Sequence, residues 1–296
     1  MKTISRIDLA DFGSPERIAQ EIIKQVPDLP IPVPIDELAR MLDITDITTL
    51  ETQGFEGGLI TDVSRSEGVI LVNQASPIQR QRFTIGHELC HFLCPWHKPR
   101  NSNQFLCTFD DMRLASTINT GKADNMEVEA NRFAAHILMP LPHFKKDLRL
   151  RKDVNIEHIL DLATSYKTSK EATTRRYVEV RDEPCAAVIS QNGRVLRFYK
   201  GSDFLPYLDV SSGNSVPRDS LTAKTNLTQA VVSDWEELDG SVWLSSPHGR
   251  RLPMIYEQVL PQSDGYRLTL LTLAEDIDEL EEEEDLEESW TPRFKR

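Results

Sequence analysis

The pattern His-Glu-x-x-His at residues 87–91 constrains this chain more than any other feature of its sequence. It lies in residues 77–95, where apolar spacing between two prolines predicts a helix. Because side chains four residues apart share one face of a helix, His87 and His91 can direct two imidazoles at one point, as a tetrahedral zinc site requires. Glu88 projects roughly 100° away from His87, where its carboxylate can take a proton from a zinc-bound water. The short pattern also arises by chance, but the predicted helix favours a metal site.

A catalytic zinc ion needs a third protein ligand and an open position for water. The second predicted helix, residues 124–139, offers Glu127 and Glu129. On a helical wheel, Glu127 and Asn131 lie at the edge of the apolar face. Glu129 lies on the solvent side, near Arg132. We therefore predict that Glu127 is the third ligand and that Asn131 hydrogen-bonds to the ligand shell. Glu129 is the alternative ligand, and is otherwise a solvated carboxylate paired with an arginine.

Two motifs follow one another along the chain. Residues 82–91 read Arg-Phe-Thr-Ile-Gly-His-Glu-Leu-Cys-His, and residues 127–140 contain Glu-x-x-Ala-Asn-x-Phe-Ala-Ala-x-x-Leu-Met-Pro. Together they resemble the ImmA/IrrE family of zinc metallopeptidases, and the resemblance covers about residues 14–180. It implies a small gluzincin-like peptidase core with one zinc ion per chain. By that resemblance the metal ligands are His87, His91 and Glu127, and the catalytic base is Glu88.

The resemblance predicts a zinc-dependent endopeptidase that hydrolyses a peptide bond in a partner protein. Members of the family typically act with helix-turn-helix repressors, which they cleave or inactivate, so we expect regulation of gene expression. A metal-containing binding module that inactivates its partner without cleavage is one alternative. A DNA-binding regulator is another, because residues 156–180 have the spacing of a helix-turn-helix and include Arg175 and Arg176. Few bases stand there against nearby acids, so direct binding of nucleic acid is not favoured.

Residues 55–59, Phe-Glu-Gly-Gly-Leu, are a candidate strand edge for holding an extended substrate, because two glycines permit close approach of another backbone. A bulge or bend in an ordinary strand explains the glycines equally well. No residue stands out as the donor that would stabilise an oxyanion. Several side chains can contribute, and each is more often an ordinary surface or packing residue: His97, His136, His143, His158 and Tyr166.

Cysteine ligation must also be weighed, because Cys90 and Cys94 lie on the predicted metal helix. With Cys107 they would make a closed structural zinc site, which is inert because it has no position for water. Small buried thiols are the commoner explanation. The four cysteines include no Cys-x-x-Cys pair and do not indicate a disulfide framework.

The expected fold class is α+β. Residues 1–146 are expected to form the metallopeptidase domain and residues 147–183 a helical, helix-turn-helix-like extension. After residue 183 the sequence pattern becomes typical of strands and turns, which predicts a β-rich C-terminal domain over residues 184–274. Hairpin turns are indicated at Asn192-Gly193 and Asp264-Gly265. Residues 275–296 form an acidic tail.

The charge of the chain is concentrated in that tail. Without the eleven acids of residues 275–288, the formal net charge of −13 becomes −2, so the charges of the remaining residues nearly balance. The composition therefore does not indicate a basic surface for nucleic acid. The chain has no apolar run near the roughly 20 residues that a membrane-spanning helix needs. No signal-peptide core is evident, so we expect a cytoplasmic protein without a membrane partner.

Overall fold

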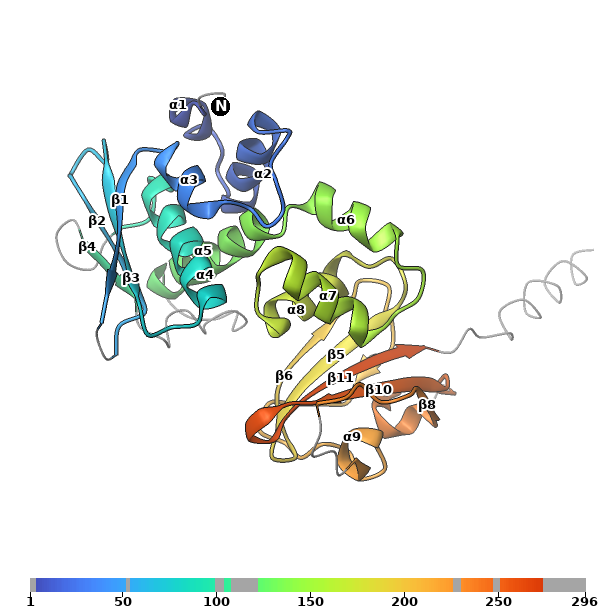
Figure 1. Ribbon diagram of the computed structural model, residues 1–296. Coiled ribbons are helices and arrows are strands. Elements are labelled where there is room, and N and C mark those ends of the chain that lie inside the picture. The colour runs from blue at the N-terminus through green and yellow to red at the C-terminus, as the bar shows by residue number, and fades with distance from the viewer. Residues whose placement is uncertain are drawn as a thin grey trace, which may run out of the picture. The chain divides into compact units, whose positions relative to one another are not determined.

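In the computed structural model, four strands form a mixed sheet beside the helices that carry the two motifs (Figure 1). The strand order is β1-β3-β2-β4, with β1 parallel to β3 and β2 antiparallel to both of its neighbours. The strands are β1 (Ile44–Leu50), β2 (Gly57–Thr61), β3 (Gly68–Asn73) and β4 (Gln104–Cys107). β2 contains both glycines of the strand that is predicted at residues 55–59. β4 lies in a segment that is rich in Pro, Asn, Ser and Thr and carries no strand pattern.

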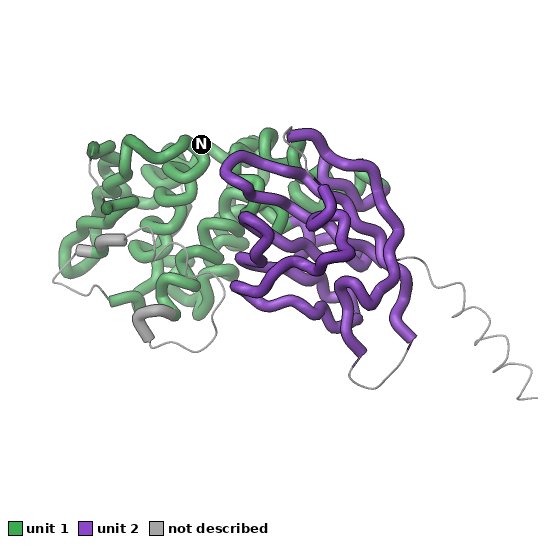
Figure 2. The backbone as a smooth tube through the Cα atoms, turned by 90° about the horizontal axis from the view of Figure 1, so that it is seen from below, with its two compact units in different colours: residues 1–152, 158–176 green, residues 153–157, 177–296 purple. Residues whose placement is uncertain are grey.

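The structure describes residues 4–51, 54–98, 104–107, 122–225, 230–246 and 251–273. The chain divides into two compact units, the first of residues 1–152 and 158–176 and the second of residues 153–157 and 177–296 (Figure 2). The mixture of helices and sheets confirms the α+β class. The predicted limits at 146/147 and 183/184 stay predictions. The acidic tail, residues 275–296, lies outside the described residues.

Local signals in the sequence explain where the helices of the first unit begin and end. Ser14 caps α2 by accepting a hydrogen bond from the Arg17 amide, and a proline follows at the first helical position. α4 begins after Pro77 and ends at Cys94, next to a proline. The helices from the N-terminus to residue 180 are α1 (Arg6–Leu9), α2 (Pro15–Gln25), α3 (Ile35–Arg40), α4 (Ile78–Leu93), α5 (Lys122–Leu138), α6 (Leu141–Arg149), α7 (Ile156–Tyr166) and α8 (Lys170–Val180).

α4 is the central helix of the first unit. It packs against β2 and β3 of the sheet, and also against α3 and α5. Every residue from Thr84 to Leu93 is buried, so this half of the helix has no solvent face. At Gly86 the helices come close, because an added Cβ would lie 3.3 Å from the Cα of Ala134 on α5. The motif histidines are therefore held inside the core, next to α5.

β2 is an interior strand, which corrects the prediction that residues 55–59 offer a free edge to substrate. Over Gly57–Ile60, β2 pairs with β3 on one side and with β4 on the other. Gly57 instead permits a close approach of α4, since a Cβ at this position would overlap Thr84 Cγ2 and lie 3.2 Å from Glu88 Oε1. Gly57 thus allows the motif helix to lie against the sheet.

The second unit contains a five-stranded antiparallel sheet with strand order β6-β5-β11-β10-β8. Both predicted hairpin turns are present. Asn192 and Gly193 have φ of +50° and +76°, and Asp264 and Gly265 have φ of +55° and +72°, as turns with left-handed residues require. The elements are β5 (Cys185–Gln191), β6 (Arg194–Lys200), β7 (Tyr207–Leu208), α9 (Leu221–Lys224), β8 (Glu236–Leu238), β9 (Leu244–Ser245), β10 (Ile255–Pro261) and β11 (Tyr266–Leu273).

Replacing Gly57 by alanine tests the packing of α4 on the sheet. We expect Gly57→Ala to destabilise the chain by about 1–3 kcal/mol, because the new methyl group overlaps a buried side chain. Urea unfolding measures this change. Adding Thr84→Ser removes the overlapping Cγ2 and should restore most of the lost stability. Gly13→Ala is the control, since a Cβ there meets nothing within 4 Å. A Gly57→Ala chain as stable as wild type would contradict this packing.

Candidate metal centre

Three predicted ligands converge at the crossing of α4 and α5. His87 Nε2 lies 3.1 Å from His91 Nε2 and 3.0 Å from Glu127 Oε2, and His91 Nε2 lies 3.6 Å from that same oxygen. Both imidazoles are fully buried, and Glu127 is 7% exposed. One turn of α4 presents the two histidines on one face, as their four-residue spacing predicts, and α5 supplies the carboxylate.

The spacing of these three atoms fits a tetrahedral metal ion. Zinc binds imidazole nitrogen and carboxylate oxygen at about 2.0–2.2 Å, and the edge of a tetrahedron with such arms is about 3.3–3.6 Å. The three observed separations, 3.0, 3.1 and 3.6 Å, lie close to that range. Two imidazoles and one carboxylate also match the donors that zinc takes in hydrolytic sites, with a fourth position left for water or substrate. The group can therefore hold a metal ion.

The pKa values of Glu127, His87 and His91 depend on one another, because the carboxylate lies next to both imidazole rings. Burial would lower the pKa of His87, but its hydrogen bond to Glu127 and the charges of Glu88 and Glu127 raise it overall. Burial lowers the pKa of His91 to about 4, against the opposing effect of Glu127. For Glu127, burial alone would raise the pKa, yet hydrogen bonds from both histidines bring it well below its usual range. The carboxylate is thus kept ionised, which is the form that binds a cation.

Asn131 orients His87, as the helical wheel predicts. Its Oδ1 lies 3.0 Å from His87 Nδ1, one turn along α5 from Glu127. An amide oxygen accepts hydrogen bonds, so Nδ1 carries a proton, which leaves Nε2 as the nitrogen that can bind a metal ion. The helix that supplies the carboxylate therefore also fixes the orientation of a histidine.

Glu88 lies on the side of α4 that faces the sheet. Its side chain is fully buried, and Oε1 lies beside Gly57 at the start of β2. Its negative charge contributes to raising the pKa of His87, the residue before it in the sequence. This position, beside the ligand group and on the same helix, suits a base for a water molecule at the metal.

His91 has hydrogen-bond partners on its outer side that sequence reasoning did not identify. Its Nδ1 lies 2.9 Å from His97 Nδ1, and His97 Nε2 lies 2.9 Å from Glu129 Oε2. Trp96 Nε1 donates to the same carboxylate oxygen at 2.7 Å. Glu129 is therefore neither a ligand of the group nor a partner of Arg132, whose described ion pair is with Glu16 at 3.7 Å. A helical wheel cannot show this, because the loop after α4 brings His97 and Trp96 back to α5.

Arg65, in the turn between β2 and β3, supports this loop. Its guanidinium donates to the backbone carbonyls of His91, at 2.9 Å, of Cys94, at 2.6 Å, and of His97. These carbonyls lie at and beyond the end of α4, where a cation is favoured by the helix dipole. The guanidinium also lies over the ring of Phe105, which stacks on His91 with 4.7 Å between ring centroids.

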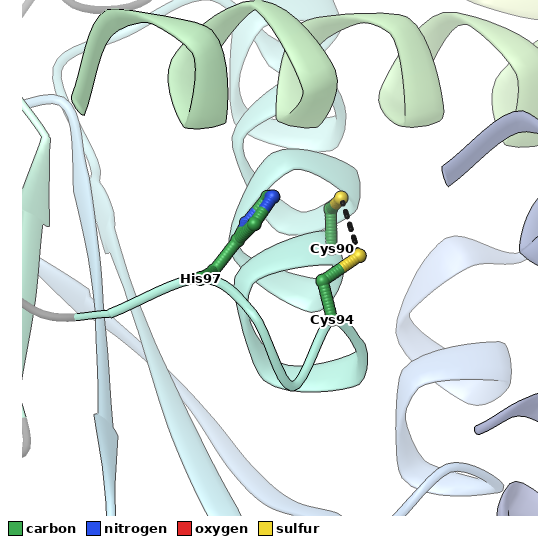
Figure 3. A group of neighbouring side chains, drawn as sticks. All are labelled: Cys90, Cys94 and His97. Carbon is green, nitrogen blue, oxygen red and sulfur yellow. Dashed lines mark hydrogen bonds between the residues drawn. The ribbon is translucent and has the colours of Figure 1, made fainter. Parts of the chain in front are cut away.

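The cysteines form a second buried group, Cys90, Cys94 and His97 (Figure 3). The two sulfur atoms lie 3.6 Å apart and share a hydrogen bond, drawn as a dashed line in Figure 3. Both nitrogens of His97 already have partners in His91 and Glu129. Burial, reinforced by Cys94, raises the pKa of Cys90 and opposes the thiolate that a metal needs. The side chain of Cys107, the third cysteine of the alternative site, lies outside the described residues.

Two other expectations concern residues away from the ligand group. Tyr166, a candidate oxyanion donor, donates its hydroxyl to Asp147 at 2.7 Å, which gives it a packing role between α6 and α7. Residues 156–180 do form two consecutive helices, α7 and α8. Arg176 is buried and donates to the Met139 carbonyl at 3.3 Å, so it is not presented to DNA. The roles of His136, His143 and His158 at an oxyanion stay predictions.

Comparisons with known proteins agree with this geometry. Residues 45–177 match the family model of the IrrE N-terminal-like domain, Peptidase M78. A solved structure, a Mycobacterium tuberculosis transcriptional regulator, aligns with a TM-score of 0.56 and 12% identity over 90% of this chain and 79% of that chain. At that identity the likeness shows the fold alone. No curated protein matches the chain.

The match to the Peptidase M78 family supports a metallopeptidase-type function for this part of the chain. The match over residues 45–177 confirms the predicted resemblance. A peptidase domain implies that the substrate is a protein or peptide. Within the described residues, no helix is both long and apolar enough to cross a membrane.

Removing the charge of Glu127 tests the third ligand. We expect Glu127→Gln to lower bound metal from about one equivalent to a small fraction, because a neutral amide oxygen is a poor zinc ligand. Elemental analysis after dialysis measures the metal, and circular dichroism checks the fold. Glu37→Gln, at an exposed position on α3, is the matched control and should keep its metal. A Glu127→Gln chain with wild-type metal content would show that another group completes the site.

Proposed function

We propose that this chain is a zinc-dependent endopeptidase that hydrolyses a peptide bond in a partner protein. The observation that carries the proposal is the convergence of His87, His91 and Glu127 at 3.0–3.6 Å, with Glu88 on the same helix. Zinc is favoured over harder ions because two of the three donors are imidazoles. When bound there, zinc would polarise the scissile carbonyl and lower the pKa of a water molecule to about 7.

Each residue has a distinct task in the proposed reaction. His87, His91 and Glu127 hold the ion. Glu88 takes a proton from the attacking water and returns it to the amine of the leaving peptide, which is the work of a general acid–base. Asn131 keeps His87 in the tautomer that binds metal, because its amide oxygen accepts the Nδ1 proton.

We place an extended substrate at the edge of the sheet. β4 is the terminal strand next to β2 in the described sheet, and its Phe105 stacks on His91. A peptide that adds to the outer edge of β4 by backbone pairing would therefore run past the metal ligands. This assignment replaces the interior strand β2, whose edges are both paired.

The proposed substrate is a helix-turn-helix transcriptional repressor in the cytoplasm, so that cleavage would change gene expression. Two observations support this choice: the IrrE N-terminal-like domain, and the fold shared with a protein described as a transcriptional regulator. A non-cleaving anti-repressor is the second candidate, because the same ligand group could hold a structural metal ion. Direct DNA binding is less supported, since Arg176 is buried.

Glu88→Gln separates cleavage from binding. We expect this variant to keep its metal but to lose peptide hydrolysis by a factor of roughly 10²–10⁴, because an amide cannot take the proton from water. Zinc-loaded wild type and variant are each incubated with a native protein extract of the source organism, and mass spectrometry counts new amino termini. We expect termini that depend on Glu88 and that include a helix-turn-helix repressor.

The metal content of both proteins is the control for the site. Termini that appear equally with Glu88→Gln would remove Glu88 from the reaction. If wild type produces no new termini while both proteins relieve repression in cells, the non-cleaving anti-repressor would be correct instead.

A further inference from the structure

We propose that His97 and Glu129 are positioning residues that hold His91 in its metal-binding orientation. The inference rests on the proposed metal site and adds two residues to it. Three groups lie in line outward from the ligand: His91 Nδ1 is 2.9 Å from His97 Nδ1, and His97 Nε2 is 2.9 Å from Glu129 Oε2. A carboxylate behind a metal-bound histidine fixes its ring, and here a second imidazole is inserted between the two.

When His91 binds a metal ion, only one arrangement of protons allows both hydrogen bonds, from His91 to His97 and from His97 to Glu129. His91 Nε2 faces Glu127 and His87, so its lone pair must be there and its proton must be on Nδ1. His97 Nδ1 then accepts that proton in a hydrogen bond, which requires the other nitrogen of a neutral His97 to carry hydrogen. That N–H at Nε2 points to an acceptor-only group, the carboxylate of Glu129. Each donor therefore meets an acceptor.

The position of His97 is built into the fold. The ring is fully buried, although it follows the end of α4. The Arg65 guanidinium holds its backbone carbonyl together with those of His91 and Cys94. Glu129 is held in turn by the indole of Trp96, at 2.7 Å. Three segments that are distant in the sequence thus converge on the outer side of His91.

The two histidine ligands are consequently anchored in different ways. His87 donates to a neutral amide, Asn131, at 3.0 Å. His91 donates to His97, and the hydrogen bond from His97 to the Glu129 carboxylate has a charged acceptor, which makes it stronger than one between neutral groups. The negative charge of Glu129, at the end of this series of hydrogen bonds, also makes His91 a more electron-rich ligand. Loss of His97 should therefore weaken the metal site, and loss of the Glu129 charge should weaken it less.

The same ring could instead be a ligand of a second metal ion with Cys90 and Cys94 (Figure 3). That role would require His97 to give up His91 or Glu129, because both of its nitrogens are already bonded. The two roles make different predictions for the number of metal ions per chain and for the effect of removing the sulfurs.

The test measures zinc affinity by competition with a chelator, and the visible absorption spectrum of the cobalt-loaded protein, for wild type and variants. We expect His97→Phe to lower zinc affinity about 10- to 100-fold and to change the cobalt spectrum, since the ring of His91 loses its acceptor. His97→Gln, whose amide oxygen can accept from His91, should recover part of the loss. Glu129→Gln should lower affinity by less than His97→Phe.

The controls keep the outcome interpretable. Glu16→Gln breaks the ion pair with Arg132 on the same helix α5 and should leave both affinity and spectrum unchanged. If His97→Phe does not fold, Glu129→Gln carries the test, because its carboxylate is one-third exposed. Cys90→Ser should leave the zinc content at one ion per chain.

Three results would overturn the inference, and they differ from one another. Wild-type zinc affinity in Glu129→Gln and in a folded His97→Phe would show that the chain of hydrogen bonds does not position His91. Two zinc ions in wild type, one of which is lost in Cys90→Ser, would make His97 a ligand of a second site. No zinc binding by wild type would overturn the proposed function as well.

Discussion

The close packing of α4 against α5 is the contact on which the rest of the site depends. Gly86 has no side chain at the crossing, and a Cβ there would lie 3.3 Å from the backbone of Ala134. This approach brings His87 next to Glu127 and Asn131, which lie one turn apart on α5. If the helices lay a few tenths of an ångström further apart, the contacts of His87 with Glu127 and with Asn131 would both lengthen. The geometry of the ligands is therefore a property of the core, not of a loop.

Burying such a polar group is costly, and the structure compensates in an ordered way. The Glu127 carboxylate faces the two imidazoles, and each imidazole has a partner for its outer nitrogen. The partner of His87 comes from the helix that supplies the carboxylate. The partner of His91 comes from the loop after α4, which Arg65 holds in place. The sheet, two helices and two connecting segments therefore all contribute to one group.

The parts of the site that could be predicted from sequence are those that follow from the period of a helix. The spacing of His87 and His91, and the edge position of Glu127 and Asn131, depend only on the helices that contain them. His97, by contrast, reaches the site through the path of a loop, and no periodicity describes that path. Glu129 lies on the polar side of α5 as predicted, but the loop covers that side, so its partners are His97 and Trp96.

The fold shows the same division. Strands β2 and β3 and the two hairpin turns follow from local patterns of apolar and turn residues. β4 has no such signal, because its four residues lie in a stretch of polar composition, and their described pairing is with the distant strand β2. The prediction of a free edge at residues 55–59 was wrong for this reason. Because the sequence does not predict β4, it also gives no indication that β2 has a strand on both sides.

The central claim is that the metal ion is held by two imidazoles and the Glu127 carboxylate. X-ray absorption at the zinc edge of the metal-loaded chain tests this claim most directly, because it reports the donor atoms themselves. We expect only nitrogen and oxygen neighbours at about 2.0–2.2 Å, with the outer-shell scattering of two imidazole rings. A sulfur neighbour at about 2.3 Å would place the ion at the cysteines and contradict the account.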